Sequence, residues 1–396
     1  MNKETWSVDK LRLLTPGPTP LPEEVRLTLA KDMIHHRKQG FKDIMFRVQK
    51  GLQYLFGTNQ PIMTLTSSGT GAMNAAVTGL FSPGETVLVV EAGKFGQRWS
   101  DIAQAHKLEV VALPLEWGSA VKPKEVENAL SRWSDISGVL IQASETSTGV
   151  LHPVQDIARL CSRKGILTVV DGISAVGVSP CPMDEWNIDC LITGSQKGMM
   201  LPPGLAFIAL SEAALKKAEA VKSQNFYFNL LSEREKCLSG QTLFTPAINL
   251  IVALEECLKY FQGHGLEKIY KRQWAMTCMV RAGIDSLGLE LLVRENYTWG
   301  LTSVKLPPGL DGVKLLDTVA SEYNVIMAGG QNHLKGKIVR MGHMGYVDWP
   351  DLLAGLHALR SVIIRQGGYS ASRDYLEKAM AAYEQAMKDI TGNETV

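Results

Sequence analysis

The sequence predicts an α/β protein in which a large domain is followed by a smaller C-terminal α+β unit. Between residues 62 and 210, near-continuous apolar runs alternate with stretches of helical periodicity, a pattern typical of a mostly parallel sheet covered by helices on both faces. After about residue 246 the pattern changes to long helices and a few short strands. The chain has 396 residues, enough for two or three domains at roughly 100–200 residues each.

Composition excludes several classes of protein. The chain has 41 Lys and Arg against 40 Asp and Glu, so it lacks the basic excess of a protein that binds nucleic-acid phosphates. No apolar run approaches the roughly 18–20 residues of a membrane span, and Met1–Trp6 lacks the apolar core of a signal peptide. The six cysteines show no C-x-x-C spacing, which argues against a zinc ribbon or a disulfide scaffold. We therefore expect a reduced, cytoplasmic protein with no metal, nucleic-acid or membrane partner.

Residues 1–20 are predicted to form an extended N-terminal segment. Its end, Leu14–Pro20, holds three prolines and a glycine, and proline lacks the N–H that a helix or a central strand needs. Two helical patterns follow, and apolar residues at helical spacing define the second, namely Ile44, Val48, Leu52, Leu55 and Phe56.

The large domain is predicted to extend over residues 21–260, with apolar runs as its strands and stretches such as Val154–Cys161 as its helices. In a sheet of this kind, ligands bind beyond the carboxyl ends of the strands. The predicted strands are Thr86–Val90, Val110–Leu113, Gly138–Gln142, Ile166–Val170, Cys190–Thr193 and Leu205–Leu210.

The small domain is predicted to extend over residues 261–396. Two long helices, Asn249–Phe261 and Leu266–Leu287, mark the transition, and residues 350–390 read as helical. The last residues, Gly392–Val396, are expected to fray. Strands are predicted near Leu289–Val293, Thr302–Val304 and Lys337–Met341.

Small and hydroxyl residues open a predicted helix at Thr66–Ala72. The N–H groups and the dipole of such a helix start bind anions, and hydroxyl groups add donors. A plain helix cap with glycines for a tight turn is the alternative. The stretch is not a dinucleotide fingerprint, because Asn74 takes the place of the third glycine, and it is not a P-loop, because no Gly-Lys-Ser/Thr follows.

Two candidate chemical groups follow neighbouring strands. Asp171 ends the strand that begins at Gly165, and a buried carboxylate needs a partner, either a loop that it caps or a cationic ligand atom such as a protonated ring nitrogen. Lys197 lies in Thr193–Gly198, after the next strand. An amine with a lowered pKa can become a nucleophile or a Schiff-base partner; the alternative is a surface lysine in a loop.

Arg340 lies inside an apolar strand of the second domain, Ile338–Gly342. A largely buried guanidinium seeks a carboxylate, supplied either by an internal salt bridge or by a substrate acid in a bidentate clamp. The anion cradle, the strand-end Asp171, Lys197 and this arginine together fit pyridoxal phosphate. Its phosphate, protonatable ring nitrogen and aldehyde require such partners, and its enzymes use a Schiff-base lysine and commonly an aspartate that faces the ring.

From Pro16 to about residue 365, the chain resembles the class V aminotransferases of pyridoxal-phosphate fold type I, and among them the alanine–glyoxylate and serine–pyruvate aminotransferase branch. The resemblance implies an α/β fold with a mostly parallel seven-stranded sheet in the large domain and a smaller C-terminal α+β domain. It rests on the order and spacing of the motifs Pro16–Pro18, Ser68–Gly71, Gly96–Arg98, Ser147–Val150, Asp171–Gly172, Gly194–Lys197 and Arg340–Gly342.

The resemblance also implies roles for single residues. Lys197 would carry the Schiff base and move a proton between the substrate and the cofactor, and Asp171 would pair with the ring nitrogen. Phe95 matches the aromatic that stacks on the ring, where many relatives have Trp. Ser147 would lie on the 3′-oxygen side of the ring. The phosphate would be held by Ser68, Gly69 and Thr70, with Gln196 close by.

The remaining implied residues concern the substrate and a second subunit. Arg340 would clamp the substrate carboxylate, with the Gly17 backbone near the same group. The family forms homodimers with the site at the interface, and Gln241–Pro246 matches the stretch that reaches into the partner's phosphate site, where Thr245 fits its threonine. At Thr242 this chain departs from the pattern, because some relatives have Tyr there. His36 and Arg37 resemble a pair near the active-site entrance and are expected to bind the substrate, with a solvated helix end as the alternative.

The implied activity is a ping-pong transamination from a small amino acid, alanine or serine, to glyoxylate or pyruvate. Aspartate or phosphoserine as donor, and ureidoglycine–glyoxylate transamination, are alternatives within the branch. A cysteine desulfurase or related lyase would have His directly before the Schiff-base lysine, where this chain has Gln196. A binding protein that keeps the fold without catalysis would not need Lys197, Asp171 and Arg340.

Overall fold

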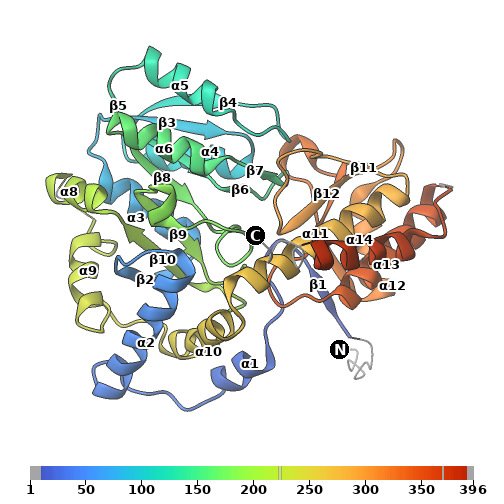
Figure 1. Ribbon diagram of the computed structural model, residues 1–396, viewed down its shortest axis with the longest axis horizontal. Coiled ribbons are helices and arrows are strands. Elements are labelled where there is room, and N and C mark those ends of the chain that lie inside the picture. The colour runs from blue at the N-terminus through green and yellow to red at the C-terminus, as the bar shows by residue number, and fades with distance from the viewer. Residues whose placement is uncertain (1–9, 222, 224, 368–369, 390–396) are drawn as a thin grey trace, which may run out of the picture.

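The computed structural model describes residues 10–221, 223, 225–367 and 370–389. The expectations for residues 1–9 and for Gly392–Val396 therefore lie outside the described residues. Within them the chain forms two α/β units, one large and one small, that lie side by side (Figure 1). This arrangement confirms the predicted fold class.

The large unit is built on a seven-stranded, mostly parallel sheet, as predicted. β10 is the exception, because it runs antiparallel to both of its neighbours, β2 and β9. The carboxyl ends of the other six strands therefore meet at one edge of the sheet. The strand order is β2 (Ile62–Ser67), β10 (Gly204–Leu210), β9 (Cys190–Gly194), β8 (Leu167–Asp171), β5 (Ile136–Gln142), β3 (Thr86–Glu91) and β4 (Glu109–Pro114).

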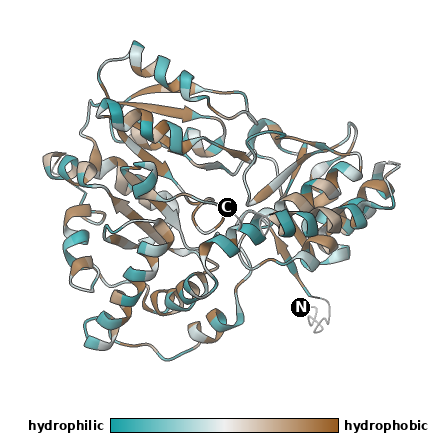
Figure 2. Cartoon of the chain, in the orientation of Figure 1, coloured by the Kyte–Doolittle hydropathy of each residue, from teal (hydrophilic) through white to brown (hydrophobic). Residues whose placement is uncertain are grey.

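Helices cover both faces of this sheet, which explains why its strands are apolar on successive residues. On β3, for example, Val87 and Val89 pack into the core beneath α3 and α4, whereas Leu88 and Val90 pack into the core on the opposite face. Figure 2 shows the hydrophobic strands between more hydrophilic helices. The helices of this unit are α1 (Glu23–Leu29), α2 (Gln39–Phe56), α3 (Gly69–Leu80), α4 (Lys94–Ala105), α5 (Pro123–Arg132), α6 (Val154–Lys164), α7 (Met183–Trp186), α8 (Glu212–Val221), α9 (Leu230–Leu238) and α10 (Ile248–His264). A two-stranded ribbon adds β6 (Ser144–Glu145) and β7 (Val150–Leu151).

The small unit is built on a five-stranded sheet that includes part of the N-terminal segment. Arg12–Leu14 forms an edge strand, β1, which runs parallel to β13; it ends before the first proline of the predicted extended stretch. The strand order is β1, β13 (Val325–Gly329), β14 (Ile338–Gly342), β12 (Leu301–Lys305) and β11 (Glu290–Leu291). The helices are α11 (Leu266–Ser286), α12 (Gly312–Tyr323), α13 (Trp349–Gly367) and α14 (Tyr375–Asp389), with a 3-10 turn, η1 (Asn332–Leu334).

Helix α11 joins the two units. Ile269, near its start, packs with the core of the large unit, whereas residues from Met276 onward pack with the core of the small unit. Leu14 belongs to the small-unit core as well, so both termini of the described chain contribute to it. The predicted domain boundary at residue 261 remains a prediction. Helix α11 itself packs with the cores of both units. None of the described helices is long and apolar enough to cross a membrane.

Candidate active site

A pocket at the carboxyl edge of the large sheet gathers seven of the predicted residues. Loops that follow β2, β3, β5, β8 and β9 form its walls, as expected for a sheet of this topology. The predicted residues that line it are Ser68, Gly69, Thr70, Phe95, Asp171, Gln196 and Lys197. Ser144, Thr146, Ile173, Ser174 and Arg98 complete the lining.

The start of α3 forms one wall of this pocket. Ser68 is the N-cap residue, and its side chain makes no capping hydrogen bond. Gly69 allows a close approach, because a Cβ atom there would overlap the side chain of Ile173, which would have to shift. Thr70 Oγ1 accepts a hydrogen bond from Nη1 of Arg98 at 3.1 Å. The helix start therefore presents N–H groups, hydroxyl groups and a guanidinium together, a combination suited to a phosphate.

Asp171 lies at the last position of β8 and is buried, with 5% of its surface exposed. Its Oδ1 accepts a hydrogen bond from the N–H of Ile173 at 2.8 Å. Burial raises the pKa of this carboxyl to about 6; the charge of Glu145 acts in the same direction, and the charges of Arg98 and Lys197 oppose it. A carboxylate held in this way gains from a cationic partner in the pocket.

Lys197 follows β9 and contacts the N-terminal segment. Its Nζ donates to the carbonyl oxygen of Pro16, and its own carbonyl accepts from Thr19 Oγ1 at 3.1 Å. Gly17 packs so closely that a Cβ atom there would overlap the lysine side chain. Burial lowers the pKa of Lys197 to about 8, with the charge of Asp171 opposing the shift. An amine with this pKa has a substantial neutral fraction near neutral pH, as nucleophilic chemistry requires.

Arg340 lies on β14 of the small unit, with 6% of its surface exposed. Its Nε donates to the carbonyl of Gly329 at 2.8 Å and its Nη1 to the carbonyl of Thr146 at 2.7 Å. Among the described residues it forms no salt bridge, so the internal ion pair that the sequence also allowed is not present there. Burial lowers its pKa to about 10. Thr146 also lines the Lys197 pocket. The hydrogen bond to its carbonyl therefore connects Arg340, a residue of the small unit, to the site.

The start of α4 depends on Glu145, a residue for which the sequence predicted no role. Glu145 is fully buried and accepts hydrogen bonds from the N–H groups of Phe95 (3.2 Å), Gly96 (3.0 Å) and Ser147 (3.1 Å). Ser147 Oγ also donates to it at 2.5 Å and accepts from the N–H of Lys94 at 3.0 Å. Ser147 is thus buried behind the pocket wall, and the predicted contact of this residue with the cofactor stays a prediction.

Arg98 is the second residue with no assigned role. Its guanidinium lies over the Phe95 ring, 4.8 Å from the centroid, and is near enough to Asp171 and Lys197 to shift both pKa values. A signal for both missed residues was available. Glu145 follows the predicted strand at Gly138–Gln142, on the same edge as Asp171, and Arg98 lies one helical turn after Phe95.

Besides Gly17, Ser147 and Arg340, which are described above, three more predicted residues are not among those that line the Lys197 pocket of their own chain. Thr245 is exposed and lines a small hollow with Thr64, Glu233 and Thr242. Arg37 donates to Gln241 and to the carbonyls of Thr242 and Leu243. The ring of His36 stacks on that of His35 with centroids 5.0 Å apart.

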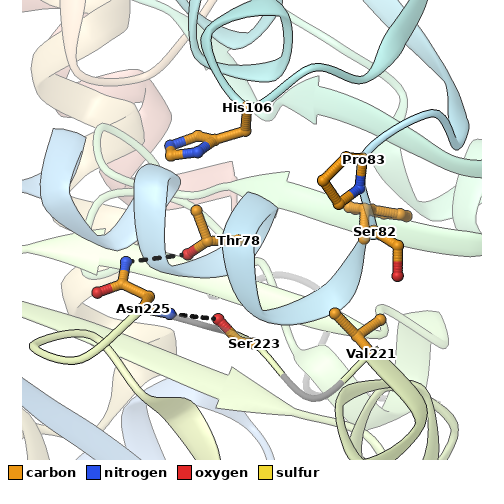
Figure 3. Close-up of a pocket in the computed structure, with 8 residues that line it drawn as sticks. Thr78, Ser82, Pro83, His106, Val221, Ser223 and Asn225 are labelled. Atoms are coloured by element: carbon orange, nitrogen blue, oxygen red, sulfur yellow. Dashed lines mark hydrogen bonds between the residues drawn. The ribbon is translucent and has the colours of Figure 1, made fainter.

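A second pocket lies at the C-terminal end of α3 (Figure 3). Asn225 Nδ2 donates to Thr78 Oγ1 at 3.2 Å and the Asn225 N–H to Ser223 Oγ at 3.2 Å. His106, on the opposite wall, hydrogen-bonds Asn74 at 2.8 Å. Among the described lining residues none is Lys, Arg, Asp or Glu, so this pocket lacks the charged groups of the Lys197 site. Within the described residues there is also no group of three His, Cys, Asp or Glu arranged to hold a metal ion.

Comparisons with known proteins agree with the chemistry of the Lys197 pocket. Residues 22–346 match the aminotransferase class-V family. The small subunit of a soluble hydrogenase from Synechococcus sp. is 36% identical over 362 residues, which is 91% of this chain and 94% of that protein. The L-aspartate–glyoxylate aminotransferase of Paracoccus denitrificans is 30% identical (94% of this chain and 98% of that one), and the serine–glyoxylate aminotransferase of Methylorubrum extorquens is 30% identical (92% and 96%).

A solved structure shows the same fold. The ureidoglycine–glyoxylate aminotransferase of Bacillus subtilis matches with a TM-score of 0.90 at 26% identity, over 96% of this chain and all of that chain. The pocket fits the cofactor of such enzymes. It combines a lysine with a lowered pKa, a buried carboxylate, a helix start suited to an anion, and an oxygen, Gln196 Oε1, that is buried without a hydrogen-bond partner among the described residues. The chain is therefore a member of the class V aminotransferase family, an enzyme of pyridoxal-phosphate fold type I from the alanine–glyoxylate and serine–pyruvate branch, with pyridoxal phosphate as its cofactor.

Proposed function

We propose that this aminotransferase moves the amino group of a small amino acid, alanine or serine, to glyoxylate or pyruvate by a ping-pong reaction. The observation that carries the proposal is one pocket that combines Lys197, Asp171 and the start of α3. Bound pyridoxal phosphate supplies an aldehyde for covalent capture of an amine and a ring that withdraws electrons from it. The predicted cytoplasmic location remains a prediction.

Each residue would do one physical task in this reaction. Lys197 Nζ would hold the cofactor covalently and then take a proton from the substrate Cα, because its lowered pKa makes a neutral amine available. Asp171 would keep the ring nitrogen protonated through a charge-assisted hydrogen bond. Ser68, Gly69 and Thr70 would bind the phosphate.

Substrate recognition would begin at Arg340, whose guanidinium has carbonyl partners at two nitrogens and no carboxylate among the described residues. A guanidinium in this state suits the α-carboxylate of an amino acid. The Gly17 backbone lies close to the Lys197 side chain. Gln196, Phe95 and Ser147 complete the proposed cofactor contacts.

Small donors are favoured over acidic ones by the charges near the pocket. A donor such as aspartate or phosphoserine needs a second cation for its side chain. Among the described lining residues, Arg98 is the only arginine, and it is engaged with Thr70 and Phe95. Aspartate remains the runner-up donor because one relative is named for it. The named aminotransferase relatives share glyoxylate, which supports glyoxylate as acceptor.

We also propose that the enzyme is a homodimer in which Thr245, together with His36 and Arg37, approaches the partner's site. Support comes from exposed apolar side chains around the Gln241–Pro246 segment. Phe226 is 81% exposed and packs against Phe244 with ring centroids 5.5 Å apart, and Phe46, also exposed, lies against Gly240. Such surface is normally covered in a soluble protein.

A desulfurase or lyase activity has less support. Five of the six cysteines are buried, and burial raises the pKa of all six thiols, which makes them poor nucleophiles. No cysteine is among the described residues that line the Lys197 pocket. One relative is named as a hydrogenase subunit, but the Lys197 pocket of this chain favours amine chemistry.

The test is a matrix of donors and acceptors read by absorbance of the bound cofactor. Alanine, serine, aspartate, phosphoserine and cysteine are each added to the cofactor-loaded enzyme, followed by glyoxylate or pyruvate. We expect alanine or serine to change the spectrum and glyoxylate to restore it. A faster response to aspartate would favour the runner-up, and persulfide formation on a cysteine would favour the desulfurase. A spectrum unchanged by every donor would contradict transamination.

A further inference from the structure

Two ionisable side chains hold the Gln241–Pro246 segment by hydrogen bonds. Arg37 Nη1 donates to Gln241 Oε1 at 3.0 Å and to the Thr242 carbonyl at 3.1 Å, and Arg37 Nη2 donates to the Leu243 carbonyl at 3.4 Å. From α9, Glu233 Oε2 accepts the Leu243 N–H at 2.9 Å. Both backbone polar groups of Leu243 are therefore bound by ionisable side chains rather than by the main chain.

Glu233 lies in an interior environment. It is 5% exposed, and burial raises the pKa of its carboxyl to about 7, with the charge of Arg37 opposing the shift. Within the described part of the chain, its second oxygen, Oε1, is buried without a hydrogen-bond partner, as is Thr64 Oγ1. Both residues line the same small hollow beneath Thr242 and Thr245. Burying an acid that has a single N–H partner costs folding free energy. We therefore expect Glu233 to have a function at this segment.

The segment has a defined shape but exposes its tip. Thr242 Oγ1 donates to the Phe244 carbonyl at 2.7 Å, and the Tyr227 ring stacks on Phe244 at 5.1 Å with the ring planes 2° apart. Thr245, next in the chain, is exposed. A shaped segment with an exposed hydroxyl residue at its tip is suited to present that residue to another molecule.

We propose that Arg37 and Glu233 are positioning residues that hold Gln241–Pro246 ready for the second subunit, and that Arg37 does not bind the substrate. This inference rests on the proposed function, in which Thr245 reaches the partner's cofactor phosphate. The guanidinium of Arg37 already has three oxygen acceptors within its own chain, so little of its donor capacity remains for a substrate carboxylate. Its loss would weaken cofactor binding and leave the affinity for amino donor unchanged.

The experiment compares Arg37→Ala, Arg37→Lys, Glu233→Ala and Glu233→Gln in the full-length protein. Three quantities are measured: the Kd of pyridoxal phosphate for the cofactor-free enzyme, the KM of alanine, and amide hydrogen exchange at Leu243. Arg37→Ala and Glu233→Ala should each raise the Kd tenfold or more, the effect of losing at least one charge-assisted hydrogen bond. Both should also speed exchange at Leu243 and leave KM within about twofold.

The conservative variants and a surface control sharpen the test. Glu233→Gln keeps an acceptor for the Leu243 N–H and should keep slow exchange, whereas Arg37→Lys loses the fork of donors and should behave like Arg37→Ala. Arg365→Ala removes an exposed ion pair with Glu322 in the small unit and should change none of the three quantities.

Two results separate failure of this inference from failure of the proposed function. A KM for alanine that rises tenfold or more in Arg37→Ala, with unchanged cofactor Kd and unchanged exchange at Leu243, would overturn the inference and restore Arg37 as a substrate contact. A wild-type protein that binds no pyridoxal phosphate would instead overturn the proposed function. The exchange measurement would then still decide whether Arg37 and Glu233 hold the segment.

Discussion

Burial prepares Lys197 and Asp171 for opposite tasks at the residue scale. It disfavours the charged form of each group, so the pKa of the lysine falls to about 8 while that of the aspartate rises to about 6. Each charge opposes the shift of the other. A cationic ring nitrogen beside Asp171 would favour its ionised form, and covalent capture of the cofactor would turn the amine of Lys197 into a less basic imine.

Cofactor loading should therefore depend on pH through Lys197. Only the neutral amine attacks an aldehyde, and the fraction of neutral amine increases as the pH rises through about 8. Stopped-flow absorbance after mixing cofactor-free enzyme with pyridoxal phosphate should show a rate that rises from pH 6.5 and levels off above about pH 8.5. A rate that continues to climb tenfold per unit up to pH 10 would indicate an ordinary, unshifted lysine.

Asp171 should lower the stability of the cofactor-free protein. Its folded pKa of about 6 exceeds the ordinary 3.8, so the folded state binds the proton more tightly, and stability falls as the pH rises from about 4 to 6. Asp171→Asn should therefore stabilise the cofactor-free protein at pH 7.5, on the order of 2 kcal/mol, while weakening cofactor binding. Urea unfolding measures the first effect.

The matched control for this prediction is Asp317→Asn on α12, where the carboxylate is exposed. This change should leave the free energy of unfolding within about 0.5 kcal/mol of wild type. A cofactor-free Asp171→Asn protein that is less stable than wild type at pH 7.5 would show that the carboxylate is a structural cap rather than a site for a cation.

At the scale of elements, the helix starts position the chemistry. The start of α3 faces the pocket without a side-chain cap, whereas the start of α4 is tied to Glu145 by the N–H groups of Phe95 and Gly96. One helix start is thereby left for a ligand, and the other is fixed by the protein itself. Because the Thr146 carbonyl next to Glu145 accepts from Arg340, the same loop joins the two units.

Glu145→Gln should therefore cost stability and function together. The amide keeps one acceptor oxygen but turns an NH2 group toward backbone N–H donors, which leaves buried donors unpaired, at about 2–3 kcal/mol. Denaturant unfolding should show this loss, and cofactor titration should show weaker binding. Glu125→Gln at the exposed start of α5, where the carboxylate accepts the Lys122 N–H, should cost about 1 kcal/mol or less. Equal costs at the two sites would contradict the role given to Glu145.

Much of this element structure could be predicted from the sequence, for a physical reason. Strands covered on both faces are apolar throughout, so β3, β8 and β9 stand out locally. The strand β1 could not be predicted, because its three residues pair with β13, which lies more than 300 residues later. The sequence places Glu145 and Arg98 beside predicted site residues, but only the fold shows the contacts between elements that give them their roles. Arg37 was linked to the substrate by resemblance, and only the fold shows its contacts with Gln241–Leu243.

At the scale of the whole molecule, net charge does little to attract the substrate. With 41 basic and 40 acidic side chains, no long-range field favours an anionic cofactor or anionic substrates. Attraction must come from placed groups at the meeting point of the two units, namely the start of α3, Arg98 and Arg340. Both units contribute to this site, and α11 connects their cores.

We predict that the protein is a homodimer in solution. Light scattering after gel filtration should give about twice the chain mass of 43.4 kDa. Phe226→Asp, at the 81% exposed ring beside Phe244, should shift the protein toward monomer and weaken cofactor binding, because a charge in an apolar interface is costly. Val313→Asp, at an exposed residue of the small unit, is the control and should do neither. A monomeric wild type with full transaminase activity would contradict the shared site.

The most direct test of the central claim is to locate the bond between the protein and its cofactor. The cofactor-loaded enzyme is reduced with borohydride, digested, and examined by mass spectrometry for the modified lysine, with Lys197→Ala as control. We predict that the label is on Lys197, and that Lys197→Ala folds normally, carries no label at that position and lacks transaminase activity. A label on another lysine of the wild type, or an active Lys197→Ala variant, would contradict the account.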